Sequence, residues 1–384
     1  MEHMKTTQEL IDQIAIERNL SPSTKYNYKL SVEYFEKHIG MTLVDLIEIA
    51  KDEERNPNII WSESTLRNSI ISFRSNLYRK HKEKTAEQYL SKILAILKHI
   101  GITVYDLPSF SKKQTIKGTP IYPEDLLDRE TIQKCIDSAP TIIVKPLCLG
   151  FTSTGLSVID MLNISIQDYL HSTKDYHNAN NIYQAIQEME NKDVIPVFKS
   201  SRRKTGINYI TFASPEFVKA TNAYLLTREN LQLDDPLFEI TRRHVNRVFQ
   251  RINDNLNLGK VNDEVSKFSP KMMRIYHASQ LHEAGVSSDM IDILQGRTPK
   301  GLIYKSYIRI KTDVLRDEYI KALPYLVISE TSKFKTELDV VKEENKKFHE
   351  IVEDIDKRIE SKIQEAMEKY SGPLTDDEFR DLFS

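Results

Sequence analysis

The chain has 384 residues, of which 29% are charged and 40% hydrophobic, a composition typical of globular proteins and unlike that of disordered ones. This length exceeds what one hydrophobic core usually organises, so two compact domains and an appendage are expected. No apolar run approaches the roughly 18 residues that span a bilayer, and segment 1–17 lacks the apolar stretch of a secretory signal, so we predict a cytoplasmic protein without a membrane span.

The net charge of −2 is unevenly distributed along the chain. Segment 331–384 has 10 Lys and Arg against 15 Asp and Glu, whereas segment 61–118 has 11 against 4. A basic segment interleaved with tyrosines is typical of a surface that contacts phosphates, although many soluble helices also carry a lysine-rich face. The candidate DNA-binding residues from this segment are Arg79, Lys84, Lys112, Lys113 and Lys117.

Metal and nucleotide chemistry receive no support from the motifs. Cys135 and Cys148 are too few for a disulfide framework or a four-ligand zinc site, and both are expected to be small buried hydrophobes. The sequence contains neither HExxH, nor a Cys/His ladder, nor a GxxxxGK[ST] phosphate loop. We therefore predict no metal and no cofactor.

The N-terminal segment, 1–118, is predicted to be a helical bundle. The first helix with clear signals follows a cap at 21–24 and ends at Gly40; two more are expected from Ser62 and from Thr85, the latter closing at Gly101. Segment 109–123 is polar and basic, contains Gly118, and has little apolar periodicity, which indicates a linker.

The second predicted domain spans 119–327 and is mostly helical. Helical patterns begin at Asp128 and lead through 147–151 to Gly155. Two β-rich runs, 194–198 and 207–212, are separated by a basic turn and predict a hairpin. Everything beyond is expected to be helical, in the segments 215–225, 242–256, 270–284, 287–294 and 303–308.

The tail, 328–384, has the pattern of a coiled coil. Hydrophobic residues recur there at alternating spacings of four and three, with Asn345 at an a position, where a buried amide favours a parallel dimer. The members of this pattern are Phe334, Leu338, Val341, Asn345, Phe348, Val352, Ile355 and Ile359. A long single helix packed on its own domain is the alternative. Gly372 and Pro373 would end the helix in either case.

Arginine, lysine and tyrosine occur in separate segments of the second domain. Cleaving a phosphodiester without a metal requires a nucleophile, cations that hold the non-bridging oxygens, and an acid for the leaving oxygen. Lys271 and Arg274 are three residues apart on one helix face, so both can reach one anion. Arg297 follows in Gln-Gly-Arg, and Tyr307 lies ten residues further on.

These residues resemble the conserved boxes of the tyrosine recombinase, or phage-type integrase, family over roughly residues 25–323. Segment 153–160 is similar to the first box, in which the family has arginine at the position of Ser157 and an acid at that of Asp160. Lys204-Thr205-Gly206 resembles the hairpin with the catalytic lysine. Segment 270–285 resembles the second box, with Lys-x-x-Arg in place of His-x-x-Arg, and segment 294–297 resembles the last box, where archaeal relatives commonly have arginine instead of histidine.

The resemblance implies a helical core-binding domain joined to a catalytic domain in a C-shaped clamp on duplex DNA. Tyr307 would attack the scissile phosphate and form a 3′-phosphotyrosine, Lys204 would protonate the leaving 5′ oxygen, and Arg274 and Arg297, helped by Lys271, would bind the phosphoryl oxygens. The expected activity is site-specific recombination or integration by a tetramer on DNA, with a dimer formed through the tail.

Ser157 departs from the family pattern, because a hydroxyl brings no charge and losing such a cation typically costs about 3 to 4 kcal/mol. Either Arg202 or Arg203 supplies the missing positive charge, or the chain is a DNA-binding relative of the family whose cleavage activity is weak or lost. A structural coiled-coil scaffold is a third reading, which leaves the basic boxes unexplained. Taken singly, each basic residue is an ordinary surface charge, and Tyr304 is the second candidate nucleophile.

Overall fold

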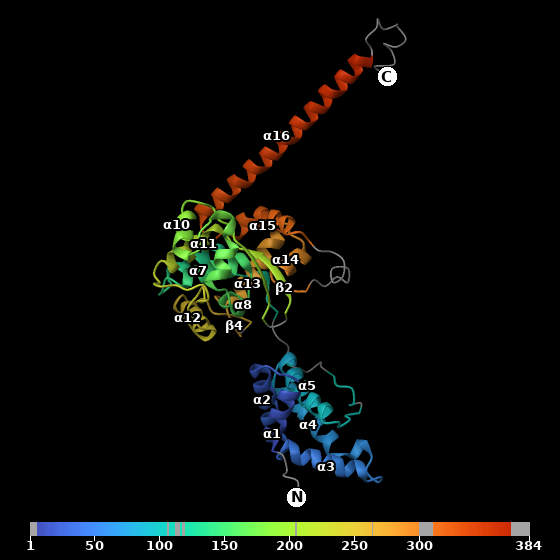
Figure 1. Ribbon diagram of the computed structural model, residues 1–384. Helices are drawn as coiled ribbons and strands as arrows, with labels where there is room; N and C mark the ends of the chain where they lie inside the picture. Colours follow the sequence, from blue (N-terminus) through green and yellow to red (C-terminus); the bar gives the residue numbers. More distant parts are fainter. Residues whose placement is uncertain are drawn as a thin grey trace. The chain divides into compact units, whose positions relative to one another are not determined.

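The computed structural model describes residues 6–105, 107–111, 116, 120–203, 206–262, 264–298 and 310–369; of these, residues 333, 334, 343, 344 and 366–369 are described in their backbone only. The chain divides into two compact units, Met1–Pro120 and Ile121–Ser384. Most described residues are helical, and the strands form two small antiparallel sheets (Figure 1), which confirms the predicted mainly helical class.

The first unit is a helical bundle with its own core. Phe35 and Phe73 are fully buried at its centre, with ring centroids 4.9 Å apart in an edge-on arrangement. Ser21 caps α2 by accepting a hydrogen bond from Thr24 N, and Gly40 ends that helix in a left-handed conformation, as predicted. The helices are α1 (Thr7–Glu17), α2 (Pro22–Ile39), α3 (Leu43–Arg55), η1 (Trp61–Glu63), α4 (Thr65–Lys80) and α5 (Glu83–His99).

The predicted helix start at Ser62 was wrong by a few residues. Ser62 lies in the short turn η1, whereas Ser64 has an extended backbone and accepts a hydrogen bond from Arg67 N, so α4 begins at Thr65. Two serines two residues apart offer equivalent caps, and only the backbone conformation distinguishes them.

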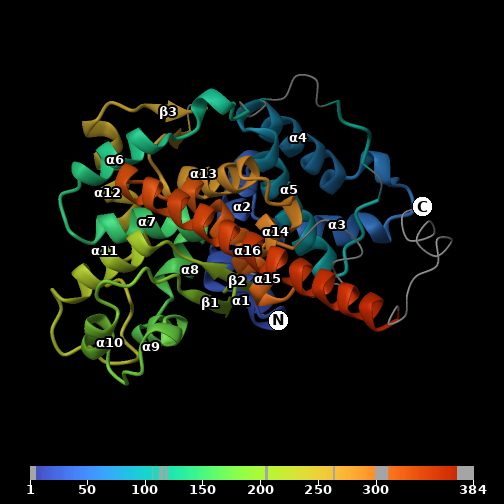
Figure 2. The same ribbon diagram turned by 90° about the horizontal axis from the view of Figure 1, so that it is seen from above.

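The second unit is built around α7 (Val144–Thr154), a helix buried on nearly every side. It packs against α11 (Pro215–Leu225) and α13 (Pro270–Glu283). Figure 2 shows two further helices of this unit, α9 and α10, side by side. The remaining elements up to the tail are η2 (Pro123–Asp125), α6 (Arg129–Asp137), α8 (Val158–Leu162), α9 (Ile166–Ser172), η3 (Lys174–Tyr176), α10 (Ile182–Glu188), α12 (Arg242–Asn255), α14 (Ser288–Leu294) and α15 (Thr312–Leu326).

The predicted hairpin is present, with a shifted first strand. Strand β1 (Val197–Ser201) pairs antiparallel with β2 (Asn208–Phe212), and Val197 lies opposite Phe212. The first strand was expected to begin at Val194, but Pro196 has no N–H to donate to a ladder, so the pairing starts after it. The expectation that all later segments are helical was also wrong, because β3 (Lys260–Val261) and β4 (Val265–Ser266) pair. Two-residue strands are too short to produce an alternating pattern.

Helix α16 (Glu330–Lys369) is one uninterrupted helix (Figure 1). Its first turns pack against α15, and Glu216 of α11 accepts hydrogen bonds from Ile328 N at 2.8 Å and Ser329 N at 2.9 Å, just before the helix begins. Further along, Leu338, Phe348 and Ile355 are 54%, 64% and 49% exposed. The described part of α16 therefore carries apolar side chains that the other described residues leave exposed.

Both cysteines are buried in the core of the second unit, as expected from their number and isolation. Burial raises the pKa of the Cys135 thiol to about 12 and that of Cys148 well above its ordinary value, which keeps both in the unreactive thiol form. No helix in the described part of the chain has the length and apolar character that a membrane crossing requires.

Candidate active site

Arg274, on the second turn of α13, connects two loops that are distant in sequence. Its guanidinium donates one hydrogen bond to the carbonyl oxygen of Gly155, at the end of α7, and another of 2.8 Å to that of Gln295, after α14. Ser269 and Pro270 start α13 as cap and first helical residue, and so set the rotation of the helix that directs Arg274 to this point. Arg274, from the second box, thereby connects Gly155 of the first box to Gln295 of the last box.

The side chain of Gln295 connects the turn after α14 to the backbone of α13. Its side chain is fully buried, its Nε2 donates to the carbonyl oxygen of Arg274 at 2.9 Å, and the same nitrogen lies 3.0 Å from Nδ1 of His277. Neither Gln295 nor His277 was predicted to belong to the site. The available signal was a polar residue beside apolar ones, with His277 inside α13 and Gln295 directly after α14, since buried polar groups are nearly always hydrogen-bonded.

The close approach of these elements requires a glycine at position 155. Gly155 has a φ of +62°, and a Cβ there would lie 2.5 Å from Nδ1 of His277 and 2.9 Å from Nε2 of Gln295. Both the left-handed conformation and the missing side chain are therefore needed. Burial, followed by the charges of Arg274 and Arg297, lowers the pKa of His277 to about 3, so the ring is neutral.

Ser157 caps α8 and does not carry the charge that the family pattern has at this position. Its Oγ donates to Oδ2 of Asp160 at 2.6 Å and accepts from Asp160 N at 3.4 Å. The Asp160 carboxylate is buried, with 4% of its side chain exposed, and its ion-pair partner is Arg202, whose Nε lies 3.2 Å from the same Oδ2. Arg202 follows strand β1 directly.

Three arginines converge on the turn 295–297. Arg274 binds the carbonyl oxygen of Gln295, Arg202 donates from Nη1 to that of Gly296 at 3.4 Å, and Arg297 is the next residue. Burial lowers the pKa of Arg274 to about 10, with further contributions from the positive charges of Arg297 and Arg202. Guanidinium groups held this close repel one another, and a bound anion would relieve that repulsion.

The other predicted cations are more exposed. Arg297 has 45% of its side chain exposed, and its Nη1 lies 3.8 Å from Oδ1 of Asp292. Lys271 is exposed on the first turn of α13, and Arg203 is exposed and donates to Oδ1 of Asn163 at 2.9 Å. The structure thus brings Arg202, Arg274 and Arg297 to one place and directs Arg203 elsewhere.

Several predicted residues fall outside the described part of the chain. These are Tyr307, Tyr304, Lys204, Lys112, Lys113 and Lys117, together with the helix expected at 303–308. Arg79 and Lys84 are described and exposed, on α4 and α5 of the first unit. Among the described residues, no group of three or more His, Cys, Asp or Glu side chains could hold a metal ion.

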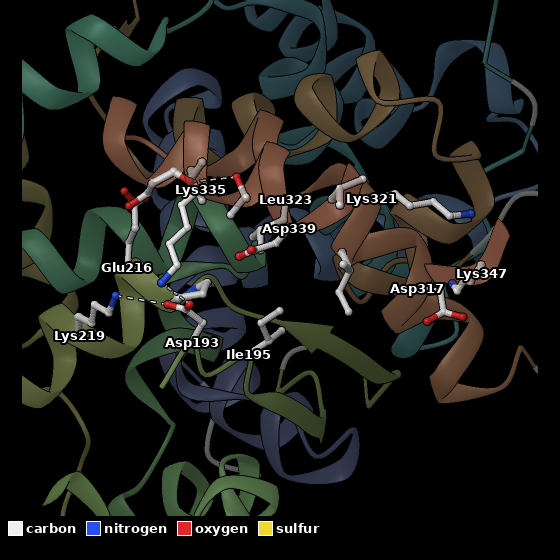
Figure 3. A pocket seen from close by; sticks show the side chains of 16 residues that line it. Asp193, Ile195, Glu216, Lys219, Asp317, Lys321, Leu323, Lys335, Asp339 and Lys347 are labelled. Carbon is white, nitrogen blue, oxygen red and sulfur yellow. Dashed lines mark hydrogen bonds and ion pairs between the residues drawn. The ribbon is translucent and has the colours of Figure 1, made fainter. Parts of the chain in front are cut away.

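A cavity of about 360 Å³ lies elsewhere in the second unit, between α11, α15 and α16. Figure 3 shows Lys219 and Lys335 directed at Asp193, with Nζ to Oδ distances of 3.4 Å and 2.5 Å. None of the three converging arginines lines this cavity. Because Lys335 lies near the start of α16 and Lys219 on α11, their shared pairing with Asp193 connects these two helices, and we assign the cavity a structural role.

No protein-family model and no curated protein matches the sequence. Among solved structures, the XerH site-specific recombinase bound to palindromic difH substrate matches with a TM-score of 0.50 and 15% identity, over 81% of this chain and 83% of that chain. A lambda integrase tetramer bound to a Holliday junction matches with 0.49 and 13%, over 81% of each chain. The Tn1549 transposon integrase with circular intermediate DNA matches with 0.43 and 14%, over 82% and 98%. At these identities the likeness concerns the fold, and the XerH match shows that this chain has a fold of the tyrosine recombinase type.

Proposed function

We propose that this protein is a site-specific DNA recombinase or integrase that cleaves and rejoins DNA strands through Tyr307. The observation that carries the proposal is the convergence of Arg202, Arg274 and Arg297 on the turn 295–297. Preorganised guanidinium groups stabilise the charge that develops on the non-bridging oxygens of a phosphodiester as a nucleophile attacks. The shared fold with a recombinase, XerH, agrees with this chemistry.

In the proposed reaction, the phenolic oxygen of Tyr307 attacks the scissile phosphorus and the bond from phosphorus to the 5′ oxygen breaks. Lys204 protonates the leaving oxygen, so the products are a 3′-phosphotyrosine and a free 5′ hydroxyl. Arg274, Arg297 and Lys271 hold the phosphoryl oxygens during the step. Attack by a second 5′ hydroxyl on the tyrosyl ester restores the DNA backbone, and the energy of the broken bond is retained in that ester.

The proposed partner is duplex DNA. The basic segment 61–118 gives the first unit an excess of positive charge, and Arg79 and Lys84 are exposed on it. Both units would contact the duplex, as in the clamp that the family resemblance implies, and Lys112, Lys113 and Lys117 would contact its phosphates. Arg297 at the position of the usual histidine favours an archaeal-type branch. The proposed source is an archaeon or a mobile element, and the proposed site of action is the cytoplasm.

We further propose that α16 assembles two copies of the chain. Leu338, Val341 and Phe348 are exposed on α16 at heptad spacings, and Asn345 is exposed at an a position of the same repeat. A second identical helix is the partner that buries such a repeat and pairs the two amides in register. The tail would thus give a dimer in solution, and two dimers would form the tetramer on DNA.

The alternative function is that of a DNA-binding or regulatory protein with weak or no cleavage, because Ser157 replaces the family arginine. A nicked suicide substrate distinguishes the two, since loss of a short 5′ fragment after cleavage traps the covalent intermediate. We expect a covalent protein–DNA adduct that maps to Tyr307 by mass spectrometry of the attached peptide. Tyr307→Phe should abolish the adduct, and Tyr304→Phe is the matched control that should retain it. DNA binding without any adduct would favour the alternative.

A further inference from the structure

We propose that Arg202 supplies the guanidinium that the family carries at the position of Ser157, and that it contacts a non-bridging oxygen of the scissile phosphate. This inference rests on the proposed function, because the phosphate is the ligand of that site. The charge has moved from the start of α8 to the connection between β1 and β2, 45 residues later in the chain.

The first argument is the shared carboxylate. Oδ2 of Asp160 binds both Oγ of Ser157, at 2.6 Å, and Nε of Arg202, at 3.2 Å. Two groups that bind one oxygen atom are neighbours, so the Arg202 guanidinium lies beside the position at which the family arginine would start. A buried carboxylate needs a cationic partner, and Arg202 is the partner that Asp160 has.

The second argument is the space that Gly296 leaves for the Arg202 side chain. A Cβ at Gly296 would lie 2.8 Å from Cδ and 3.0 Å from Cγ of Arg202, and Gly296 has a φ of +65°. The aliphatic part of the Arg202 side chain therefore packs directly on the backbone of Gly296, and a side chain at position 296 would collide with it. This packing restricts the rotamers of Arg202 and holds its guanidinium toward Arg274 and Arg297.

The third argument concerns the free end of the guanidinium. Nε binds Asp160 and Nη1 binds the carbonyl oxygen of Gly296, while Nη2 has no hydrogen-bond partner within the described ranges. With 19% of its side chain exposed, Arg202 is held by protein on one edge and open on the other. Its positive charge also contributes to lowering the pKa of Arg274, because the two guanidinium groups are close enough to repel each other.

Arg203, the other candidate surrogate, lacks these features. It is exposed, and its Nη1 donates to Oδ1 of Asn163, which lies beyond the C-terminal end of α8. The two neighbouring arginines thus give a matched pair, in which one is held in the cluster and the other is not.

The test measures the single-turnover rate of adduct formation on a nicked suicide substrate for the native chain and four variants. We expect Arg202→Ala to slow the reaction by about 100- to 1,000-fold, as is typical for loss of one transition-state donor, and Arg203→Ala to change it by less than about threefold. Ser157→Arg alone should give no gain, because the site already has its cation. Ser157→Arg combined with Arg202→Ala should recover at least about tenfold of the loss.

A substrate with a methylphosphonate at the cleavage site separates contact with the phosphate from a structural role of Arg202. Replacing a charged non-bridging oxygen by methyl removes the charge that Arg202 would neutralise, so the difference between native chain and Arg202→Ala should fall below about tenfold. An undiminished difference would show that Arg202 acts only by holding Asp160. Duplex binding within a few-fold of native would confirm that the variants are folded.

Two results would overturn the inference while leaving the proposed function intact: a native adduct rate retained in Arg202→Ala, or a large gain from Ser157→Arg alone. A native chain that forms no adduct, even with Ser157→Arg, would overturn the proposed function and this inference together.

Discussion

Lowering the pH should reduce the stability of the second unit through His277, which is fully buried and lies next to Gln295. Its pKa is lowered from 6.5 to about 3 by burial and by the charges of Arg274 and Arg297. Above pH 6.5 the ring is neutral in both the folded and the unfolded chain, and the free energy of unfolding does not depend on it. Below that value the unfolded chain binds a proton that the folded chain excludes, so stability is lost as the pH falls toward 3.

The size of the effect follows from the two pKa values. Each pH unit inside this window costs up to about 1.4 kcal/mol, so the descent from about pH 7.5 to about pH 5 should remove roughly 2 kcal/mol through this one residue. The variant His277→Asn keeps an acceptor near the position of Nδ1 and cannot be protonated in this range. It should therefore lose roughly 2 kcal/mol less than the native chain over the same interval.

The assay must follow the second unit, and the single tryptophan, Trp61, lies in the first. Hydrogen exchange of α13 peptides in increasing urea, read by mass spectrometry at the two pH values, reports on the required unit. His282→Asn removes an exposed histidine on the same helix and is the control, for which we expect the native pH dependence. Equal pH dependence in the native chain and in His277→Asn would refute the reasoning.

Two further predictions concern packing and assembly. Gly155→Ala should destabilise the second unit by about 2 to 4 kcal/mol in the same exchange assay, since the new methyl adds overpacking against His277 to backbone strain. Gly285→Ala, at a φ of +85° with nothing within 4 Å, isolates the strain and should cost about 1 kcal/mol; equal losses would contradict the packing argument. Phe348→Lys should turn the dimer into a monomer in sedimentation equilibrium, whereas Glu350→Lys, on the opposite face of the repeat, should leave it dimeric. A native chain that is monomeric at all concentrations would rule out assembly through α16.

Local structure was predictable wherever a residue type determines the backbone by itself. Ser21 and Gly40 bound α2 because a serine hydroxyl satisfies free N–H groups and glycine adopts the left-handed conformation without strain. The start of α4 was placed wrongly because Ser62 and Ser64 are equally good caps, and the choice between them depends on the turn η1. Strand β1 was placed too early because its apolar residues begin before its hydrogen-bonding ladder does.

The charged residues of the candidate site could be predicted from the sequence, but the contacts that position them could not. Arg274 and Arg297 stand out as cations in spaced motifs, but the bond from Arg274 to Gly155 spans 119 residues of sequence, and spacing cannot reveal it. Gln295 has an ordinary residue type, and its role depends on buried contacts with Arg274 and His277 of α13 and with Gly155 after α7. The choice between Arg202 and Arg203 likewise required coordinates, because adjacent residues in a turn point in different directions.

The burial of both native cysteines has a practical consequence for experiments on this chain. The sequence contains two cysteines, and each is enclosed in the core of the second unit with a thiol whose pKa is raised. A maleimide or a spin label therefore has no accessible native target while the protein is folded. One cysteine introduced on the surface of α16 would become the sole site of attachment, so probes can be placed on the tail without first removing any native residue.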